Sequence, residues 1–333
     1  MKLVSLMLSL ACMLGGALSE AQAVFKAEQN LAPCEVAPGK VFVRSRDRQL
    51  WCFEGDAGRK MDACTSAEIR HHDGAIFYGV GNSVFRLDPA KNESAEFVST
   101  KSRVRDFRWR GADQLVIASI DGVRTFRVEQ GRCRLIAEAF YSLKMNVGPV
   151  WLSEFDEEGG CAVARFWSVM KVNPDGTKGW EVAGRLNPTA APVVADGRIF
   201  TSWRLGDVMC HDSTSGELLW KKEYPHSMFG GMKSLTKDLL LVGSGDRTRL
   251  VSPSTGTTVA DLGEYSGCRG GPFAMGGGEF WYITTLHRVV RVSANERSGR
   301  EFSTLTSKPS GIARTADGGA CVVTEGAGVV DLR

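Results

Sequence analysis

Short apolar runs alternate with turn residues along most of the chain. The alternation is clearest over residues 191–224, APVVADGRIFTSWRLGDVMCHDSTSGELLWKKEY. Within it, Asp196-Gly197 separates two apolar runs, which is a strong signal for a β-hairpin. The runs predict four strands, at residues 192–194, 198–203, 208–211 and 217–221. Four short strands within about forty residues are typical of one blade of a β-propeller.

The same succession of runs and turns recurs with a period of about forty residues. We assign repeats to residues 34–63, 64–100, 103–140, 141–185, 191–224, 226–266, 267–306 and 307–333. The last repeat lacks one strand, and residues 24–31 form an extra strand before the first repeat. Because an open ring would leave edge strands unpaired, we expect the extra strand to complete the last blade. The sequence therefore predicts one all-β domain over residues 24–333, an eight-bladed β-propeller, with seven blades as the alternative.

Residues 210–220, CHDSTSGELLW, hold a more specific pattern within the fifth repeat. We expect Asp212 to accept backbone N–H groups in the turn. Gly216 is expected to adopt a positive φ angle that a β-carbon would resist. Trp220, on the outer strand, is expected to pack between two blades, where its large area is buried. The pattern thus assigns structural roles to all three residues.

This pattern resembles the tryptophan-docking motif of the PQQ-type (quinoprotein-like) propellers, written A-x-D-x-x-T-G-x-x-x-W. Cys210 stands for the Ala and Ser215 for the Thr. The spacing from turn glycine to tryptophan recurs at Trp180, and the turn glycine recurs at Gly256, so both receive structural roles as well. The resemblance implies a propeller of four-stranded PQQ-like repeats, which are WD-like in length.

The resemblance does not extend to the redox chemistry of the family. Quinoprotein dehydrogenases bind a quinone with a calcium ion and an Asp base, often next to a vicinal disulfide. This chain has no Cys-Cys pair, and none of its residues matches the quinone site. Since a fold does not imply a function, we expect no enzymatic activity, no cofactor and no metal ion.

Residues 1–23 have the features of a signal peptide. Lys2 gives a positive start, residues 3–18 form an uncharged apolar core, and Ala21-Gln22-Ala23 is the predicted cleavage site, with Ala17-Leu18-Ser19 as the second choice. The apolar run is too short, and too close to this site, to favour a retained membrane anchor. We therefore expect an exported protein, periplasmic or extracellular, with no transmembrane helix in the mature chain.

Eight cysteines follow the signal segment. They are Cys34, Cys52, Cys64, Cys133, Cys161, Cys210, Cys268 and Cys321. An even number in an exported chain suggests disulfide bonds. The alternative is that cysteines on predicted strands are small, buried hydrophobic residues, which suits Cys161, Cys210 and Cys321 in particular.

Two polar clusters could bind a metal ion. His71 and His72 are adjacent, but neighbours on a strand point to opposite faces, so a solvated turn is favoured over a ligand site. Asp156, Glu157 and Glu158 form an acidic run, which favours a solvated loop over a calcium site. The net charge of +3, without a basic stripe interleaved with aromatic residues, gives no indication of nucleic-acid binding.

Small residues begin the predicted inner strands, for example Gly148-Pro149 and Gly270-Gly271. We expect this because bulky side chains would collide where the strands converge on the ring axis. The loops before these strands gather at one mouth of the ring and mix charged with apolar side chains, which suits a protein-binding surface. We assign partner binding to Arg103, Arg105, His226, Met228, Phe229 and Arg269.

The repeats and the lack of a catalytic set predict a monomeric, non-catalytic scaffold for protein–protein interaction. The chain resembles the PQQ-like propeller lipoproteins of the outer-membrane β-barrel assembly machine, which implies a protein partner and a role in envelope or outer-membrane assembly. It departs from them in lacking a lipobox, since Ser9 stands three residues before Cys12. The alternative is a propeller that binds a small ligand in its axial cavity or acts as a quinone-dependent oxidoreductase.

Overall fold

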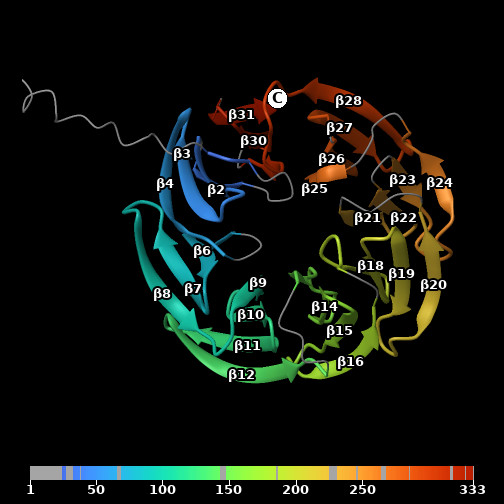
Figure 1. The fold of residues 1–333 in the computed structure, drawn as a ribbon, viewed down its shortest axis with the longest axis horizontal. Coiled ribbons are helices and arrows are strands. Elements are labelled where there is room, and N and C mark those ends of the chain that lie inside the picture. The colour runs from blue at the N-terminus through green and yellow to red at the C-terminus, as the bar shows by residue number, and fades with distance from the viewer. Residues whose placement is uncertain are drawn as a thin grey trace, which may run out of the picture.

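In the computed structural model, the chain forms a ring of β-sheets around a central axis (Figure 1). The structure describes residues 25–27, 33–37, 39–65, 69–142, 148–184, 187–224, 231–244, 247–263, 268–284, 286–315, 318–326 and 328–332. Every helix or strand assigned within these ranges is a β-strand. The short apolar runs of the sequence are therefore strands, as their period predicts.

The first half of the ring comprises β1 to β16. Their bounds are β1 (Cys34–Ala37), β2 (Lys40–Arg44), β3 (Gln49–Glu54), β4 (Ala57–Ala63), β5 (Arg70–His72), β6 (Ala75–Val80), β7 (Ser83–Asp88), β8 (Glu93–Ser99), β9 (Val104–Arg110), β10 (Gln114–Ser119), β11 (Gly122–Glu129), β12 (Arg132–Phe140), β13 (Val150–Leu152), β14 (Cys161–Arg165), β15 (Ser168–Val172) and β16 (Lys178–Ala183).

The second half comprises β17 to β31. Their bounds are β17 (Val193–Ala195), β18 (Arg198–Ser202), β19 (Asp207–Asp212), β20 (Leu218–Glu223), β21 (Met232–Thr236), β22 (Leu239–Gly243), β23 (Thr248–Val251), β24 (Thr258–Asp261), β25 (Cys268–Gly276), β26 (Glu279–Thr284), β27 (Arg288–Ser293), β28 (Ser298–Thr304), β29 (Ala313–Arg314), β30 (Ala320–Thr324) and β31 (Gly328–Leu332).

Each sheet is one blade, in which successive strands pair antiparallel from the axis outward (Figure 1). Seven sheets have four strands, and the last sheet, β29-β30-β31, has three strands within the described residues. The ring therefore has eight blades. The eight-bladed prediction is confirmed, and the seven-bladed alternative is wrong.

The fifth blade shows how the alternation of residues builds the core. Val193 pairs with Phe200, Phe200 with Cys210, and Cys210 with Trp220 across β17 to β20. Paired residues on neighbouring strands share one face of a sheet. This face packs against the sixth blade, where it meets side chains such as Leu240. Each large apolar side chain buried in this way contributes about 1.5–3 kcal/mol.

Trp180 docks the fourth blade onto a turn of the fifth, and Trp220 docks the fifth blade onto a turn of the sixth. Nε1 of Trp220 donates a hydrogen bond to the carbonyl oxygen of Pro253 over 2.8 Å, and Nε1 of Trp180 donates to that of Ser213 over 3.0 Å. Gly256 lies beneath the Trp220 ring with a φ angle of +69°, and a Cβ there would come within 2.8 Å of the ring. Only glycine therefore allows the ring to close over the turn.

The turn of the fifth blade has the bonding expected of its sequence pattern. Oδ1 of Asp212 accepts the N–H groups of Thr214 over 2.9 Å and Ser215 over 2.8 Å. These backbone bonds, Ser215 first, lower the pKa of Asp212. Gly216 has a φ angle of +77°, and a Cβ there would come within 2.8 Å of Trp180. The motif thus couples the fourth blade to the fifth.

The beginning of the mature chain lies between the first and last blades. Phe25 and Ala27 are buried in one cluster with side chains of β3 and β30. The N–H of Ala27 donates to Oε1 of Glu325, in the β30–β31 turn, over 2.8 Å. Residues 25–27 are not part of a strand, and the rest of the predicted closing strand over 24–31 lies outside the described residues. That strand and the signal peptide therefore stay predictions.

Unpaired thiols among the described residues include Cys34, Cys52, Cys133, Cys161 and Cys210. Cys161 and Cys210 are buried in apolar clusters between blades. Burial raises the pKa of both thiols to about 12. The structure therefore favours small hydrophobic residues over disulfide partners at these positions.

Candidate interaction faces

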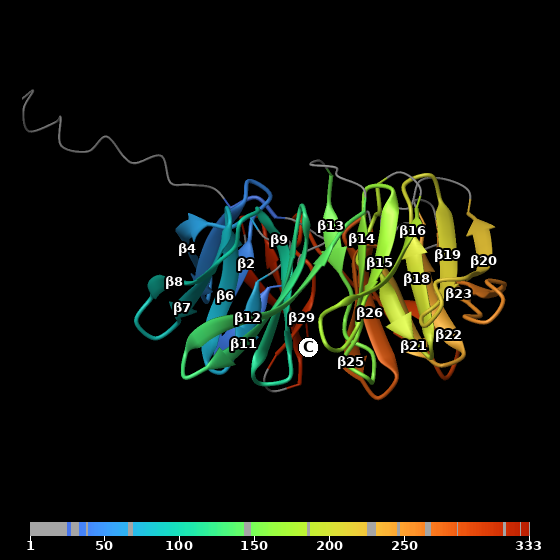
Figure 2. The same ribbon diagram turned by 90° about the horizontal axis from the view of Figure 1, so that it is seen from below.

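The turns of the blades lie on two opposite faces of the ring (Figure 2). Because strand direction alternates, turns between second and third strands share a face with the connections between blades. This connector face comprises residues 45–48, 64–65, 69, 81–82, 100–103, 120–121, 141–142, 148–149, 166–167, 184, 187–192, 203–206, 224, 231, 244, 247, 262–263, 286–287, 305–312 and 325–326. The opposite hairpin face comprises residues 39, 55–56, 73–74, 89–92, 111–113, 130–131, 153–160, 173–177, 196–197, 213–217, 237–238, 252–257, 277–278, 294–297, 315 and 318–319.

The predicted partner-binding residues lie at the connector face where the structure describes them. Arg103 is in the connection before β9, and Arg105 is the second residue of β9. Outside the described residues lie His226, Met228, Phe229 and the side chain of Arg269. The structure therefore brings together Arg103 and Arg105, and the other four assignments stay predictions.

Arg48, Arg103 and Arg105 form an arginine cluster. Arg105 is partly buried, and this burial, together with the positive charges of Arg103 and Arg48, lowers the pKa of Arg105. The Nε atoms of Arg103 and Arg105 are buried without a hydrogen-bond partner. No carboxylate in the described chain forms an ion pair with these three side chains. The cluster thus holds desolvated donors that an anionic group could satisfy.

Large apolar side chains protrude from three turns of the connector face. Trp167 is 47% exposed, and Leu205 and Leu286 are each 61% exposed. Trp167 stacks on Phe166, with ring centroids 5.2 Å apart and an interplanar angle of 12°. Its φ angle of 67° is rare for a bulky residue. The backbone therefore holds the aromatic pair at a turn tip in a strained conformation, and such strain is concentrated at functional sites.

The two faces differ in charge. Basic residues prevail on the connector face, namely Arg46, Arg48, Lys101, Arg103, Arg204, Arg247 and Lys308, against Asp47, Asp121 and Glu325. Each of these three acidic side chains is engaged by a hydrogen bond or ion pair within the protein. Acidic residues prevail on the hairpin face, namely Asp56, Asp73, Asp113, Glu154, Asp156, Glu157, Glu158, Asp175, Asp196, Glu217, Asp238 and Glu296, against Lys91, Lys237 and Arg297. The ring is therefore electrostatically polarised along its axis.

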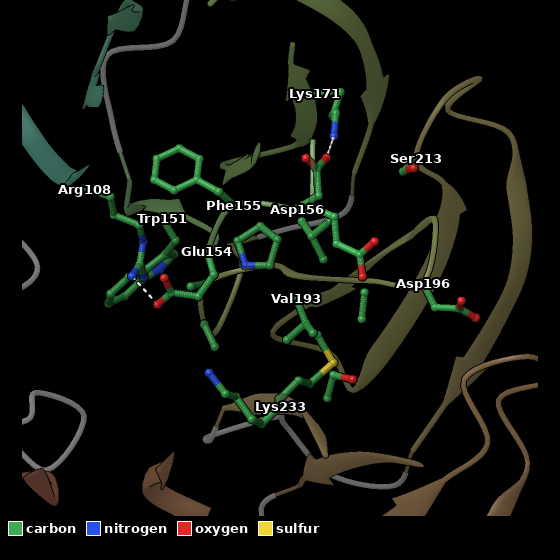
Figure 3. A pocket seen from close by; sticks show the side chains of 18 of the residues that line it. Arg108, Trp151, Glu154, Phe155, Asp156, Lys171, Val193, Asp196, Ser213 and Lys233 are labelled. Atoms are coloured by element: carbon green, nitrogen blue, oxygen red, sulfur yellow. Dashed lines mark hydrogen bonds and ion pairs between the residues drawn. The ribbon is translucent and has the colours of Figure 1, made fainter. Parts of the chain in front are cut away.

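A cavity of about 1130 Å³ is lined on the hairpin side by loop 153–160 and the turns at 196–197 and 213–214, and it extends along the inner strand of the fifth blade to residues 189–192 of the connector face. Figure 3 shows part of its lining. The fourth to sixth blades supply most of its walls. Arg108 forms an ion pair with Glu154, and Lys171 forms one with Asp156. The acidic loop 153–160, predicted to be solvated, is therefore tied by two ion pairs to β9 of the third blade and β15 of the fourth.

Arg108, which lines this cavity, also connects two neighbouring blades. Nε of Arg108 donates to the carbonyl oxygen of Leu152 over 3.0 Å, and Oδ2 of Asp106 accepts the N–H of Leu152 over 2.9 Å. These bonds connect β9 of the third blade to β13 of the fourth. Arg108 and Asp106 thus have a structural role that accounts for their burial.

His72 has a packing role in the structure. Its ring stacks on Trp109, with centroids 3.8 Å apart and an interplanar angle of 8°, and its Nε2 lies 3.1 Å from the carbonyl oxygen of Ala112. His71 and His72 belong to β5 rather than to a solvated turn. Within the described residues, no group of three or more His, Cys, Asp or Glu side chains is placed to hold a metal ion.

The sequence does not predict the places of Trp167, Leu205, Leu286 and Arg48 on the connector face. A signal for Trp167 exists, because two-residue hairpin turns favour Gly, Asn or Asp, and Phe166-Trp167 replaces them with two aromatic residues. No comparable signal marks Arg48, because its place beside Arg105 depends on how the first and third blades converge.

A family profile described as "Outer membrane protein assembly factor BamB" matches residues 166–261. Among solved structures, BamB from Moraxella catarrhalis is similar with a TM-score of 0.62 and 13% identity, over 93% of this chain and 97% of that one. The chain is a β-propeller that resembles the PQQ-like propeller of BamB.

The fold is also similar to that of two other solved structures. The computationally designed Ika8 protein matches with a TM-score of 0.67 and 12% identity, over 93% of this chain and 98% of that one. A chain of the Mitotic Checkpoint Complex matches with a TM-score of 0.58 and 12% identity, over 78% and 83% of the two chains. No curated protein matches in sequence. None of the described segments forms a helix capable of spanning a membrane.

Proposed function

We propose that this PQQ-like propeller is an exported, non-catalytic scaffold that binds a protein partner during envelope or outer-membrane assembly. The profile match over residues 166–261 and the shared fold with BamB support this proposal. The observation that carries it is the connector face, where exposed apolar side chains share one surface with Arg48, Arg103 and Arg105, which form no ion pair within the described residues.

The composition of this face is that of an interaction surface. Trp and Arg are the residues most enriched among interface hot spots. The broad faces of the blades are unavailable, because apolar clusters fill the space between them. Trp167, Leu205 and Leu286, in contrast, are at turn tips and expose about half or more of their surface. Nothing in the fold requires large apolar residues at these tips, so binding is the role that explains them.

Photo-cross-linking in the native host tests the proposal. A photoreactive phenylalanine analogue replaces Leu205 on the connector face in one variant and Leu218, at the start of β20 beside the hairpin face, in the other. The two sites are 61% and 49% exposed, so the comparison is matched in accessibility. We expect protein cross-links from position 205 and not from 218. Cross-links from 218 alone, or from neither position, would contradict the proposal.

The cavity at the hairpin face is the one observation that favours the alternative, a propeller that binds a small ligand or a quinone. Its volume of about 1130 Å³ is large enough for a small molecule. Titration of the purified protein with PQQ and calcium tests this alternative by the absorbance of bound quinone. A stoichiometric signal would support it, and we expect none.

A further inference from the structure

The separation of charge between the two faces bears on the chemistry of the partner. Basic residues prevail on the connector face, while the hairpin face collects acidic ones from nearly every blade. Long-range attraction of this kind steers a partner of opposite charge and sets its orientation. The connector face therefore attracts a negatively charged partner, whereas a positively charged partner is attracted to the hairpin face.

We infer that the connector face binds an acidic protein segment that also carries apolar side chains. The arginine cluster takes carboxylates of this segment, and Trp167 with Leu205 receives its apolar residues. This inference rests on the proposed scaffold function and names the chemistry of the partner.

The arginine cluster supplies the first argument. Arg103 and Arg105 have buried Nε donors without partners, and Arg105 is held near two other positive charges. Unsatisfied buried donors and like charges both destabilise the unbound protein. A carboxylate removes both penalties at once, because it accepts two parallel hydrogen bonds from a guanidinium and neutralises the charge.

Trp167 supplies the second, independent argument. The side chain is 47% exposed although it stacks on Phe166, and its φ angle is 67°. Backbone strain is concentrated at functional sites. The strained conformation at this exposed tip therefore indicates that the Trp167 side chain itself has a function. Leu205 occupies the equivalent turn of the next blade and is 61% exposed. The two tips form an apolar anchor on neighbouring blades.

A membrane surface would also meet basic and apolar side chains, but it fits the arginines less well. Lipid headgroups are met by exposed, flexible cations, whereas Arg103 and Arg105 are partly buried and their Nε atoms are inaccessible to solvent. A carboxylate on a protruding protein segment can enter such a recess. The observations therefore favour a protein segment, and membrane binding becomes an outcome of the test.

The experiment starts from the segment cross-linked at position 205, identified by mass spectrometry. Binding of a synthetic peptide with that sequence is measured against the purified wild-type chain and two variants. One is the double variant Arg103→Glu and Arg105→Glu. The other is the control Lys91→Glu and Arg297→Glu on the hairpin face, which changes the net charge equally. Thermal unfolding verifies that both variants are folded.

We expect the segment to contain Asp or Glu together with apolar residues. We expect the connector-face variant to bind it about tenfold or more weakly, and the control to bind like wild type. Replacing the acidic residues of the peptide by Lys should restore binding to the connector-face variant. A charge-swap rescue would not occur if the arginines only stabilised the fold.

The outcomes separate the inference from the proposed function. Cross-links from position 205 to a segment without acidic residues, or undiminished binding by the connector-face variant, would overturn the inference while leaving the scaffold function intact. Absence of protein cross-links at both positions would overturn the scaffold function itself. Cross-links to a second copy of this chain, or Arg103- and Arg105-dependent sedimentation with phosphatidylglycerol vesicles in place of protein binding, would also overturn the inference.

Discussion

Replacing Gly256 by Ala tests the docking of the fifth blade onto the sixth. Gly256 has a φ angle of +69°, and the new Cβ would lie 2.8 Å from both Cε3 of Trp220 and Cγ of Lys222. The left-handed backbone costs alanine about 1–2 kcal/mol. Crowding against the Trp220 ring adds about 1–3 kcal/mol, the range for overpacked sites. We expect the free energy of unfolding to fall by the sum of the two.

Gly74 provides the matched control. Its φ angle is +70°, and a Cβ there would meet no atom within 4 Å. Gly74→Ala therefore has the backbone cost alone. Urea denaturation measures the difference in the free energy of unfolding between the two variants, from the shift in midpoint at constant m-value. We expect Gly256→Ala to be more destabilising than Gly74→Ala by about 1–3 kcal/mol.

A double-mutant cycle identifies the ring as the cause. When Trp220 is already Ala, the ring is absent. Gly256→Ala should then lower the free energy of unfolding by much less, because most of the crowding is removed. The two changes must then be non-additive, since the residues are in contact. Equal destabilisation by Gly256→Ala and Gly74→Ala, or additivity in the cycle, would refute the reasoning that the Trp–Gly contact docks the blades.

Three further predictions concern stability and reactivity. Trp220→Ala is expected to lower the free energy of unfolding by about 2–4 kcal/mol in urea denaturation, because the half-buried ring and its hydrogen bond to Pro253 are lost. Trp220→Phe, which keeps an aromatic ring, should lower the free energy of unfolding by less. Burial lowers the pKa of His211, so stability should fall as pH drops through the unfolded-state value of about 6.5, and His211→Asn should flatten this part of the profile. The Cys161 and Cys210 thiols should react with a thiol reagent only after unfolding, because burial raises their pKa to about 12; modification in the folded state would contradict the fold.

The blade structure follows directly from the sequence. The paired residues of β17 to β20 were predictable because apolar residues alternate with period two and Asp196-Gly197 marks the hairpin. The roles of Gly216 and Trp220 were predictable because a positive φ angle and a large ring each demand a particular residue type. Such signals depend on residues that are close in the sequence, so they can be recognised without knowledge of the ring.

The candidate site could be predicted from the sequence only in part. Arg103 and Arg105 could be placed at one mouth of the ring because the sequence puts them where an inner strand begins. Arg48 could not, because it lies on the first blade and meets Arg105 of the third only through closure of the ring. At Cys161 and Cys210 the structure agrees with the alternative of buried hydrophobic residues rather than with disulfide bonds, since an even count of cysteines does not show which of them lie within bonding distance.

The most direct test of the account is the oxidation rate of Trp167 by hydroxyl radicals, measured for the chain alone and in its native complex. Trp167 is 47% exposed in the chain alone, so it should be oxidised readily and become protected in the complex. Phe155, which lines the cavity at the hairpin face, serves as the internal comparison and should be unchanged. Protection of Phe155 with unaltered oxidation of Trp167 would contradict the assignment of the connector face as the binding surface.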